Sequence, residues 1–155
     1  MISIVECDFS NRLHTTALIR LMNDYMADEM GGKRPPYTKV MEEQVIRGLE
    51  KHPSKLILLA MLNGEFVGLA NCFINFGTFA GKPFINIHDI VVLRSYRGKR
   101  IGQCLMEKIA LKARKMDCAK ITLEVRTDNL YARKLYKKLG YKEGTPPMHF
   151  WTKYL

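Results

Sequence analysis

The stretch RSYRGKRIG, residues 94–102, stands between an apolar segment typical of a strand and an apolar pattern typical of a helix. Four of its nine residues are basic, namely Arg94, Arg97, Lys99 and Arg100. A helix N-terminus already carries partial positive charge and unpaired N–H donors, so acidic residues are usually favoured there. Cations become favourable at that end when they share it with an anion, and the stretch therefore predicts an anion site.

Two glycines in the same stretch support that interpretation. Gly98 and Gly102 have no Cβ, so the backbone can approach a ligand closely. A strand, a glycine-containing turn and a helix form a common cradle for phosphates, because the turn amides and the helix N-terminus point at the anion. A diphosphate is the expected occupant. The alternative is a basic loop whose side chains point to water.

Familiar nucleotide-binding motifs are absent from the chain. No GxxxxGK[ST] sequence is present, which excludes a Walker-type loop, and no GxGxxG follows the first apolar segment, which argues against a Rossmann dinucleotide site. The net charge of +10 arises in the second part of the chain, because residues 1–50 hold 6 Lys and Arg against 8 Asp and Glu. An excess of basic residues indicates an anionic partner such as a polyphosphate, a nucleic acid or a membrane surface.

Composition limits the class of protein. The 155 residues suit one domain, residues 1–155, with a single core. No apolar run is long enough to span a bilayer and no signal sequence is evident, so we expect no membrane association. The four cysteines are widely spaced, which favours free thiols in a cytoplasmic protein, and the scattered histidines suggest no metal site.

Hydrophobic periodicity predicts an α/β domain with a mixed sheet. The expected order is β-α-α-β-β-β-α-β-α-β-β, and Asn63-Gly64 marks a two-residue hairpin turn. Thr38 is expected to cap the second helix, and Gly140 to end the last one. The expected strands are residues 2–8, 55–62, 65–75, 84–93, 119–125, 141–144 and 148–155, and the expected helices are residues 12–30, 38–50, 101–116 and 129–139.

The basic stretch, extended to RSYRGKRIGQCLM, resembles the pyrophosphate loop of GNAT-type N-acetyltransferases, Q/R-x-x-G-x-G/A. Arg97 and Gly102 match its first and sixth positions. Arg100 stands at the fourth position, which is usually Gly. We expect Arg100 to keep the backbone that the glycine would adopt, with its side chain turned outward.

A second motif agrees with the first. The segment NLYARKLYKKLGYK resembles the downstream motif of the same family, N-x-x-A-x-x-L-Y-x-x-x-G-F/Y, and the resemblance covers residues 84–143. It implies a single-domain GNAT-like fold with a mostly antiparallel central sheet flanked by helices. It also implies acetyl transfer from acetyl-CoA, as co-substrate, to a primary amine. The matching residues are Asn129, Ala132, Leu135, Tyr136, Gly140 and Tyr141.

The resemblance also assigns residues to the cofactor, with no metal. The backbone of Ile90, Val91 and Val92 would pair with the pantetheine arm, and the Ile90 N–H would polarise the thioester carbonyl. Asn129 would hydrogen-bond the arm. The full set implied to bind acetyl-CoA is Ile90, Val91, Val92, Arg97, Gly98, Lys99, Arg100, Ile101, Gly102, Gln103, Asn129, Ala132 and Tyr136.

Two side chains are candidates for catalysis. His88 would take a proton from the amine, because imidazole titrates near neutral pH, and Tyr136 would donate one to the departing CoA thiolate. Asp89 competes with His88 as the base, although strand alternation predicts that it faces the other side of the sheet. The alternative for Tyr136 is a core aromatic, and for His88 a histidine satisfied within the sheet. Cys104 lies in a helix and is expected in the core, so we expect direct attack in a ternary complex.

The acceptor is expected near the loop EMGGKRPPYTK, residues 29–39, where Tyr37 would pack on a small basic amine. Five acidic residues near that loop would attract an ammonium group, or else lie on solvated helix faces: Asp24, Asp28, Glu29, Glu42 and Glu43. Phe150 and Trp151 would add aromatic surface or form a homodimer seam. The competing functions are a basic nucleic-acid-binding module, which lacks a recognisable reading motif, and a catalytically silent CoA-binding regulatory protein.

Overall fold

The computed structural model describes all residues from 1 to 155 and divides them into two compact units, Met1–Glu124 and Val125–Leu155. The first unit contains the strands β1 (Ile2–Glu6), β2 (Lys55–Leu62), β3 (Glu65–Gly77), β4 (Lys82–Val92) and β5 (Ile121–Leu123). Its helices are α1 (Arg12–Ala27), α2 (Lys39–Lys51), the short 3-10 helix η1 (Arg94–Tyr96) and α3 (Ile101–Lys115). The second unit contains α4 (Leu130–Lys138).

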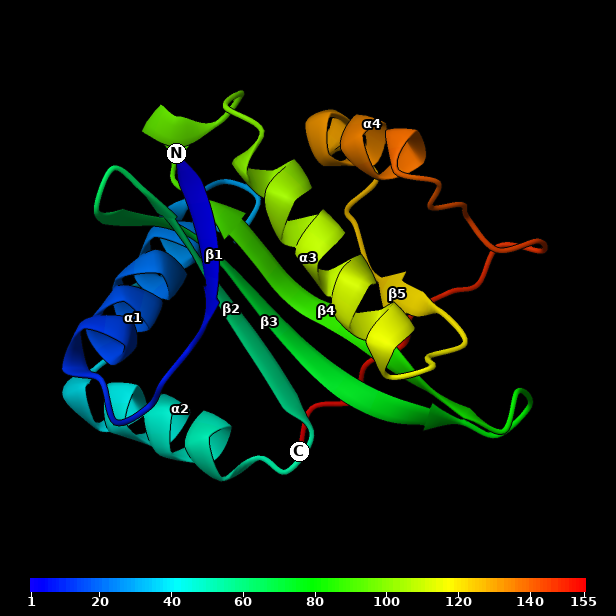
Figure 1. Ribbon diagram of the computed structural model, residues 1–155, viewed down its shortest axis with the longest axis horizontal. Helices are drawn as coiled ribbons and strands as arrows, with labels where there is room; N and C mark the ends of the chain where they lie inside the picture. The colour runs from blue at the N-terminus through cyan, green and yellow to red at the C-terminus, as the bar shows by residue number, and fades with distance from the viewer. The chain divides into compact units, whose positions relative to one another are not determined.

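The five strands form one sheet in the order β1-β2-β3-β4-β5 (Figure 1). The first four pair antiparallel and β5 pairs parallel to β4, which confirms the predicted α/β class with a mixed, mostly antiparallel sheet. The parallel pairing is short and ends where Ile87 meets Leu123. Beyond that point β4 runs from His88 to Val92 with no strand along its outer edge.

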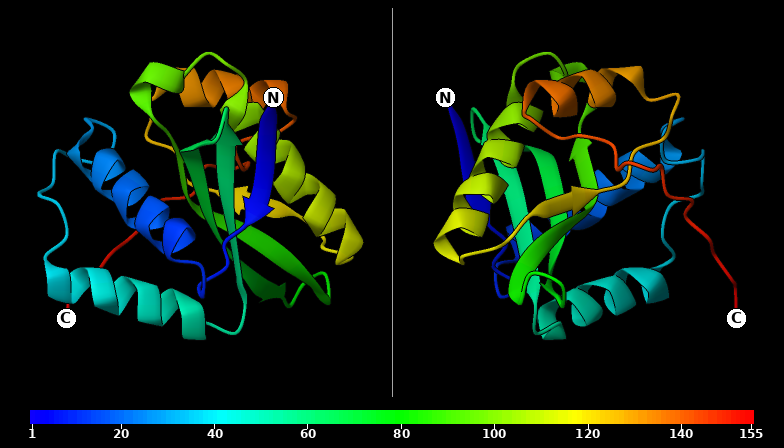
Figure 2. Two further views of the ribbon diagram at one scale, coloured as in Figure 1. Left: turned by 60° about the vertical axis from the view of Figure 1, so that its left-hand side comes forward. Right: turned by 90° about the vertical axis from the view of Figure 1, so that its right-hand side faces the viewer.

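Helices α1 and α3 cover opposite faces of this sheet (Figure 2). Leu18 and Leu21 of α1 and Leu105 and Ile109 of α3 are fully buried, as the apolar spacing predicted. Helix α2 has no fully buried residue, so its apolar face is left to line a cavity rather than a core. None of the helices is both long and apolar enough to cross a membrane.

Local backbone geometry explains the turn of the β2–β3 hairpin and the close packing of α3 on the sheet. Asn63 and Gly64 have φ of 52° and 84°, the pair of positive values that a two-residue turn of type I′ needs, and the predicted hairpin is confirmed. At Gly68 on β3 a Cβ would lie 3.1 Å from Ile101 Cγ2 and 3.1 Å from the Val91 carbonyl oxygen. The missing side chain therefore lets the first turn of α3 pack directly on the sheet.

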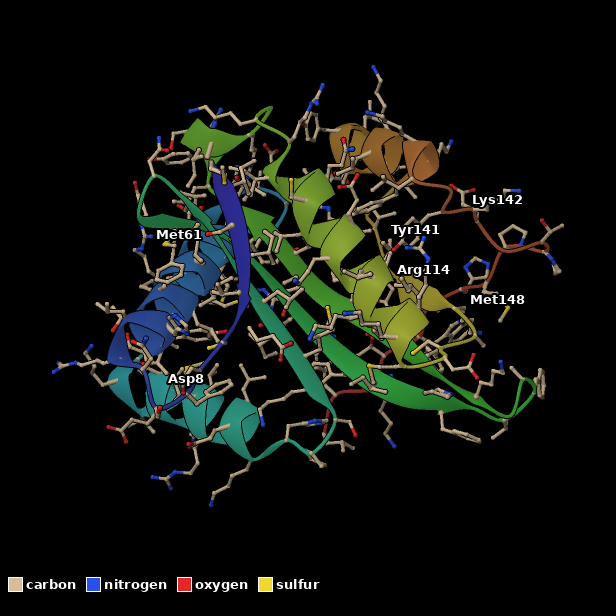
Figure 3. The ribbon with its side chains drawn as sticks, viewed as in Figure 1. Asp8, Met61, Arg114, Tyr141, Lys142 and Met148 are labelled. Atoms are coloured by element: carbon tan, nitrogen blue, oxygen red, sulfur yellow. The ribbon has the colours of Figure 1, made fainter.

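The connections around α1 are held by hydrogen bonds. Before α1, the Asp8 carboxylate accepts the backbone N–H of Ser10 at 2.9 Å and its hydroxyl at 2.7 Å (Figure 3). After α1, a Cβ on Gly31 would lie 1.8 Å from the Tyr25 carbonyl oxygen, so only glycine fits. Gly31 thus permits close packing of the loop on α1, and the Tyr37 N–H donates to Asn23 Oδ1 at 2.9 Å.

Two predicted strands do not form. Residues 139–155 contain no strand, and all residues from 142 to 155 are exposed, among them Lys142 and Met148 (Figure 3). Alternation predicted strands here, but a strand is stable only when its backbone is paired, and the neighbouring Pro146 and Pro147 have no N–H to donate. The order of elements up to α4 is as predicted, with Thr38 as the cap of α2.

Candidate active site

A β-bulge on β4 shapes the centre of the first unit. Asn71 on β3 pairs with Asp89, whereas the next residue, Cys72, pairs with Ile87, so His88 is the extra residue of β4. A bulge bends the strand and re-aims its side chains. His88 and Asp89 consequently line the same cavity. The expectation that Asp89 faces the opposite side of the sheet is wrong, because strict alternation applies only to a regular strand.

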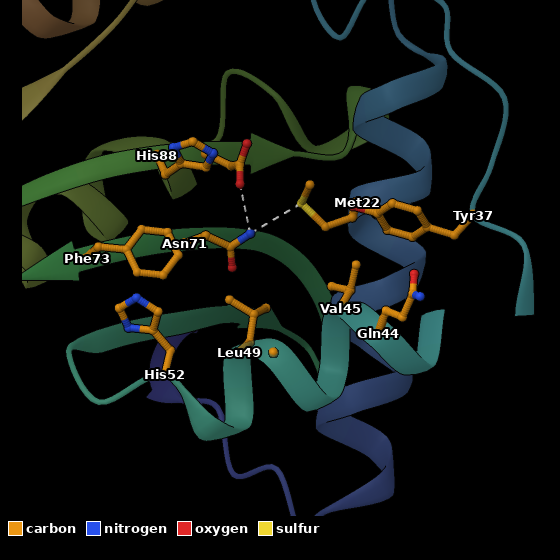
Figure 4. A pocket seen from close by; sticks show the side chains of 11 residues that line it. Met22, Tyr37, Gln44, Val45, Leu49, His52, Asn71, Phe73 and His88 are labelled. Atoms are coloured by element: carbon orange, nitrogen blue, oxygen red, sulfur yellow. Dashed lines mark hydrogen bonds between the residues drawn. The ribbon is translucent and has the colours of Figure 1, made fainter. Parts of the chain in front are cut away.

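The cavity has a volume of about 370 Å³ and lies between α1, α2 and the sheet (Figure 4). Tyr37 lies in it, and the predicted contact of this residue with an acceptor stays a prediction. Asp89 is the only carboxylate among the residues that line it, and no Lys or Arg is among them. Those residues are Met22, Tyr37, Gln44, Val45, Gly48, Leu49, His52, Asn71, Phe73, His88 and Asp89.

None of the five acidic residues predicted to attract an ammonium group lines this cavity. Asp28 accepts the Met30 N–H at 3.0 Å and pairs with Arg97 at 3.0 Å. Glu42 pairs with Lys39 at 2.9 Å, and with Glu43 it lines a separate groove between α1 and α2. Sequence proximity to the loop therefore did not identify the carboxylate of the cavity, which comes from β4.

Asn71 is a residue of the cavity that the sequence did not reveal. Its side chain is only 4% exposed, and its Nδ2 donates to Asp89 Oδ2 at 3.0 Å and contacts Met22 Sδ at 3.3 Å (Figure 4). Its Oδ1 is buried without a hydrogen-bond partner. The one available signal was an asparagine inside the apolar run GLANCFI, because buried amides require a reason.

Aromatic and imidazole rings form another wall of the cavity. The Phe73 ring lies 4.7 Å from His52 and 5.7 Å from His88, measured between centroids. His52 Nδ1 accepts the Ser54 N–H at 3.2 Å, whereas the ring nitrogens of His88 have no partner within the chain. Burial, reinforced by the Asp89 carboxylate, raises the pKa of the Tyr37 hydroxyl. Tyr37 therefore stays protonated and can donate a hydrogen bond at neutral pH.

The outer edge of β4 beyond the bulge presents free backbone groups. Leu93 N–H donates to the Val67 carbonyl at 3.0 Å, and the Val91 carbonyl faces Gly68, so both residues turn their backbone toward β3. In an antiparallel pair the orientation alternates, which turns Ile90 and Val92 toward the free edge. The Val92 carbonyl accepts Arg97 Nε at 3.1 Å. The Ile90 N–H is thus a donor on an open edge.

The turn between η1 and α3 has the backbone of an anion cradle. Gly98 and Arg100 have φ of 79° and 64°, and Arg100 is the N-cap residue of α3 without a capping side chain. The N–H groups of residues 98–102 have no acceptor within the chain. Arg100 is exposed in the left-handed conformation that glycine adopts freely, which agrees with the backbone expected at that position.

The basic side chains of the turn differ in their surroundings. Arg97 is held by Asp28 and by the Val92 carbonyl, so its guanidinium is already occupied within the chain. Lys99 Nζ lies 4.8 Å from the centroid of the Tyr96 ring, and Arg100 makes no ion pair. Lys99 and Arg100 therefore remain the cations of the turn that are available to an anion.

The second unit holds the remaining predicted site residues. Asn129 caps α4 by accepting the Ala132 N–H at 3.2 Å, Tyr136 is the buried residue of the helix, and Gly140 ends it with φ of 88°. The Tyr136 and Tyr141 rings lie 6.0 Å apart. Capping occupies the Asn129 oxygen, and the predicted roles of Asn129, Ala132 and Tyr136 toward a cofactor stay predictions.

Comparison with known proteins gives consistent matches. The model of the acetyltransferase (GNAT) family matches residues 18–141. The uncharacterized N-acetyltransferase YhfO of Bacillus subtilis (strain 168) is 32% identical over 102 residues, which are 66% of this chain and 68% of YhfO. A thialysine N-epsilon-acetyltransferase of Bos taurus is 34% identical over 79 residues, which are 51% of this chain and 46% of that protein.

Solved structures share the fold at low sequence identity. A probable acetyltransferase superposes with a TM-score of 0.82 at 18% identity, covering 100% of this chain and 98% of its own. The aminoglycoside acetyltransferase meta-AAC0020, from an uncultured soil metagenomic sample and in complex with sisomicin, superposes with a TM-score of 0.79 at 17% identity, covering 99% and 97% of the two chains. These two matches concern the fold.

Proposed function

The chain belongs to the acetyltransferase (GNAT) family, and from that premise we propose that it transfers the acetyl group of acetyl-CoA to a primary amine of a small molecule bound in the cavity beside Asp89. The observation that carries the proposal is the layout of β4. One strand supplies His88 and Asp89 to the cavity, then the free Ile90 and Val92 edge, and then runs into the basic turn.

The chain's own groups fit acetyl-CoA, which supplies an activated acetyl thioester. The unpaired amides of residues 98–102, the α3 N-terminus and the cations Lys99 and Arg100 suit its diphosphate. The outward backbone groups of Ile90 and Val92 suit the amides of the pantetheine arm, which pair with an open strand edge. We assign the Ile90 N–H as the donor to the thioester carbonyl oxygen, where it would polarise the carbonyl.

The cavity supplies the groups that an amine needs. An alkylamine attacks only after losing a proton, so a base must lie within reach of its nitrogen. His88 has unpartnered ring nitrogens on the bulge, and we assign it as the base. Asp89, which the bulge brings into the same cavity, is the competing base. Tyr136 is assigned as the acid that protonates the departing sulfur.

We favour direct attack in a ternary complex over an acylated cysteine, because no cysteine lines the cavity. Cys104 of α3 was expected in the core but is half-buried. Burial, with the Asp89 carboxylate, raises the pKa of the Cys72 thiol to about 12, and burial with Asp8 raises that of Cys7 to about 11. Neither thiol forms a thiolate at neutral pH, and the thiolate is the nucleophilic form. A cytoplasmic location and a homodimer seam at Phe150 and Trp151 stay predictions.

Calorimetry and an amine screen test the proposal. We expect the full chain to bind both acetyl-CoA and its desulfo analogue, and to release CoA in the presence of a primary amine. Tyr136→Phe is expected to slow turnover while leaving the Kd for acetyl-CoA nearly unchanged. The absence of binding by both compounds would contradict the transferase assignment, and unchanged turnover in Tyr136→Phe would remove the role of that hydroxyl.

A further inference from the structure

The buried oxygen of Asn71 has a fixed direction. Its Nδ2 donates to the Asp89 carboxylate at 3.0 Å, and rotating the amide by half a turn would aim Oδ1 at that carboxylate instead. Two acceptors facing each other repel, so the hydrogen bond to Asp89 selects one orientation. Oδ1 is therefore held inside the cavity wall as an acceptor that the chain itself does not use.

Leaving such an atom unpaired lowers the stability of the folded chain, and native structures contain few of them. The Nδ2 atom of the same amide lies beside the Asp89 carboxylate, and neither Lys nor Arg lines the cavity to balance that charge. A group that carries positive charge and several N–H donors would satisfy Oδ1 and the carboxylate at once. A primary ammonium has three donors and no acceptor.

We propose that Asn71 Oδ1 and the Asp89 carboxylate together bind the ammonium form of the acceptor, and that the acceptor is a small alkyl- or arylalkylamine with no anionic group beside its nitrogen. This inference rests on the proposed function, because it assigns the acceptor class of that same cavity. Once Asn71 and Asp89 hold the nitrogen, His88 on the adjacent bulge is the group placed to receive its proton.

The other residues that line the cavity indicate which kind of group carries the amine nitrogen. Met22, Val45, Leu49 and Phe73 are apolar, and they suit a hydrocarbon or aromatic stem. A carboxylate or phosphate next to the amine would face Asp89 with no Lys or Arg in the lining to offset the repulsion. The volume of about 370 Å³ lies at the lower end of the range of small-molecule sites and accommodates a small stem.

The first experiment compares two leucine variants by CoA release and calorimetry. Asn71→Leu removes the acceptor oxygen, and with it the Nδ2 donor to Asp89, at nearly constant shape. We expect the KM for phenethylamine to rise about tenfold or more, equivalent to at least one lost hydrogen bond to a charged group. The Kd for acetyl-CoA should not change. Asn86→Leu is the matched control, because that β4 amide donates to Thr122 Oγ1 at 3.1 Å and does not line the cavity. Its KM should equal that of the parent.

The second experiment compares acceptors that differ by one carboxylate. Phenethylamine and phenylalanine share the same ring and amine, and we expect kcat/KM for phenethylamine to be larger by about tenfold or more, because only phenylalanine places an anion beside Asp89. Equal values for the two compounds would overturn the assigned acceptor class.

A binding measurement keeps this inference separate from the proposed activity. In the isotope-labelled full chain, the side-chain amide signals that vanish in Asn71→Leu belong to Asn71. They should shift when phenethylamine is added at about pH 7, where the amine is protonated. A shift without any acetylation would support the ammonium site and contradict the transferase function. Acetylation with unshifted Asn71 signals and an unchanged KM in Asn71→Leu would overturn the ammonium site and leave the function standing.

Discussion

At its bulge, β4 contributes Asp89 to a cavity whose lining contains no Lys or Arg, whereas the turn after β4 presents the amides of residues 98–102 and exposed cations with no acidic residue among them. The two regions are adjacent in sequence and opposite in charge. The cavity depends on contacts between distant segments, since Asn71 and Met22 hold its polar groups. The turn depends on the backbone of a few consecutive residues.

The difference teaches how one strand can serve two ligands of opposite charge. A cation site built from a buried amide and a carboxylate needs precise pairing between β3 and β4. An anion site built from amides needs only the local φ values of Gly98 and Arg100. Substitutions in one region should therefore affect one ligand and spare the other.

Asp89→Asn should give the largest effect. It removes the only carboxylate that lines the cavity, and we expect kcat/KM for the amine to fall roughly 100-fold, as for loss of a buried charged partner. The Kd for acetyl-CoA, measured by calorimetry, should stay the same. Asp117→Asn is the control, because this exposed carboxylate pairs with Lys82 at the far end of β4. Loss of acetyl-CoA binding in Asp89→Asn would show that the two regions are not separable.

The same difference explains what the sequence could predict. The turn was predictable, because its charges, glycines and strand–helix context are contiguous, and so were the hairpin at Asn63-Gly64 and the buried faces of α1 and α3. His88 was found as a candidate on the strand that forms the site.

The cavity was only partly predictable. A single extra residue in β4 reverses the side that Asp89 faces, and no pattern in one strand reveals where its partner β3 skips a residue. The lack of a partner for Asn71 Oδ1 likewise depends on how β3 pairs with β4 and packs against α1. The strands expected after α4 do not form, for a related reason. Alternation of apolar and polar residues suits a strand, but it does not show whether a neighbouring strand is present to pair with it.

Gly98→Ala should weaken the binding of acetyl-CoA and spare the amine, whereas Asp89→Asn should do the reverse. A Cβ has space at this position, but φ of 79° costs an L-residue about 1–2 kcal/mol, so the turn is expected to relax from its amide-cradling shape. We expect the Kd for acetyl-CoA to rise about tenfold and the KM for the amine to stay unchanged.

Gly64→Ala is the matched control for Gly98→Ala. Gly64 also has open space and a positive φ, of 84°, but it lies in the β2–β3 hairpin. It should lose a comparable amount of stability, measured by chemical denaturation, without any change in acetyl-CoA affinity. Equal weakening of acetyl-CoA binding in both variants would mean that Gly98 acts through overall stability alone.

Arg100→Gly should have a smaller effect, and it acts on stability. Glycine removes the strain of the left-handed N-cap, so we expect the free energy of unfolding to increase by about 1 kcal/mol. Arg100→Ala is the companion variant, because it removes the same charge and keeps the strain. Both variants should bind acetyl-CoA more weakly at low salt, but only Arg100→Gly should gain stability. A gain in both would trace the effect to charge repulsion in the turn.

Asp28→Asn should have the smallest effect, and it probes the ion pair that joins the α1–α2 loop to the turn. The Met30 N–H and the Arg97 guanidinium lower the pKa of Asp28 below its usual value. A lowered pKa stabilises the folded chain above the unfolded value of about 3.9, and that contribution is lost as the pH falls through the lower folded value. The parent should therefore exceed Asp28→Asn in stability by less than about 1 kcal/mol near neutral pH, as for a partly exposed ion pair.

Denaturant unfolding of both proteins across the acid range measures this difference. It should be constant above about pH 5 and shrink toward zero as Asp28 becomes protonated in the folded chain, because the carboxyl then resembles the amide. If the difference instead persists at the lowest pH, the Met30 and Arg97 hydrogen bonds do not favour the carboxylate. The contact between the α1–α2 loop and the turn would then not depend on the charge of Asp28.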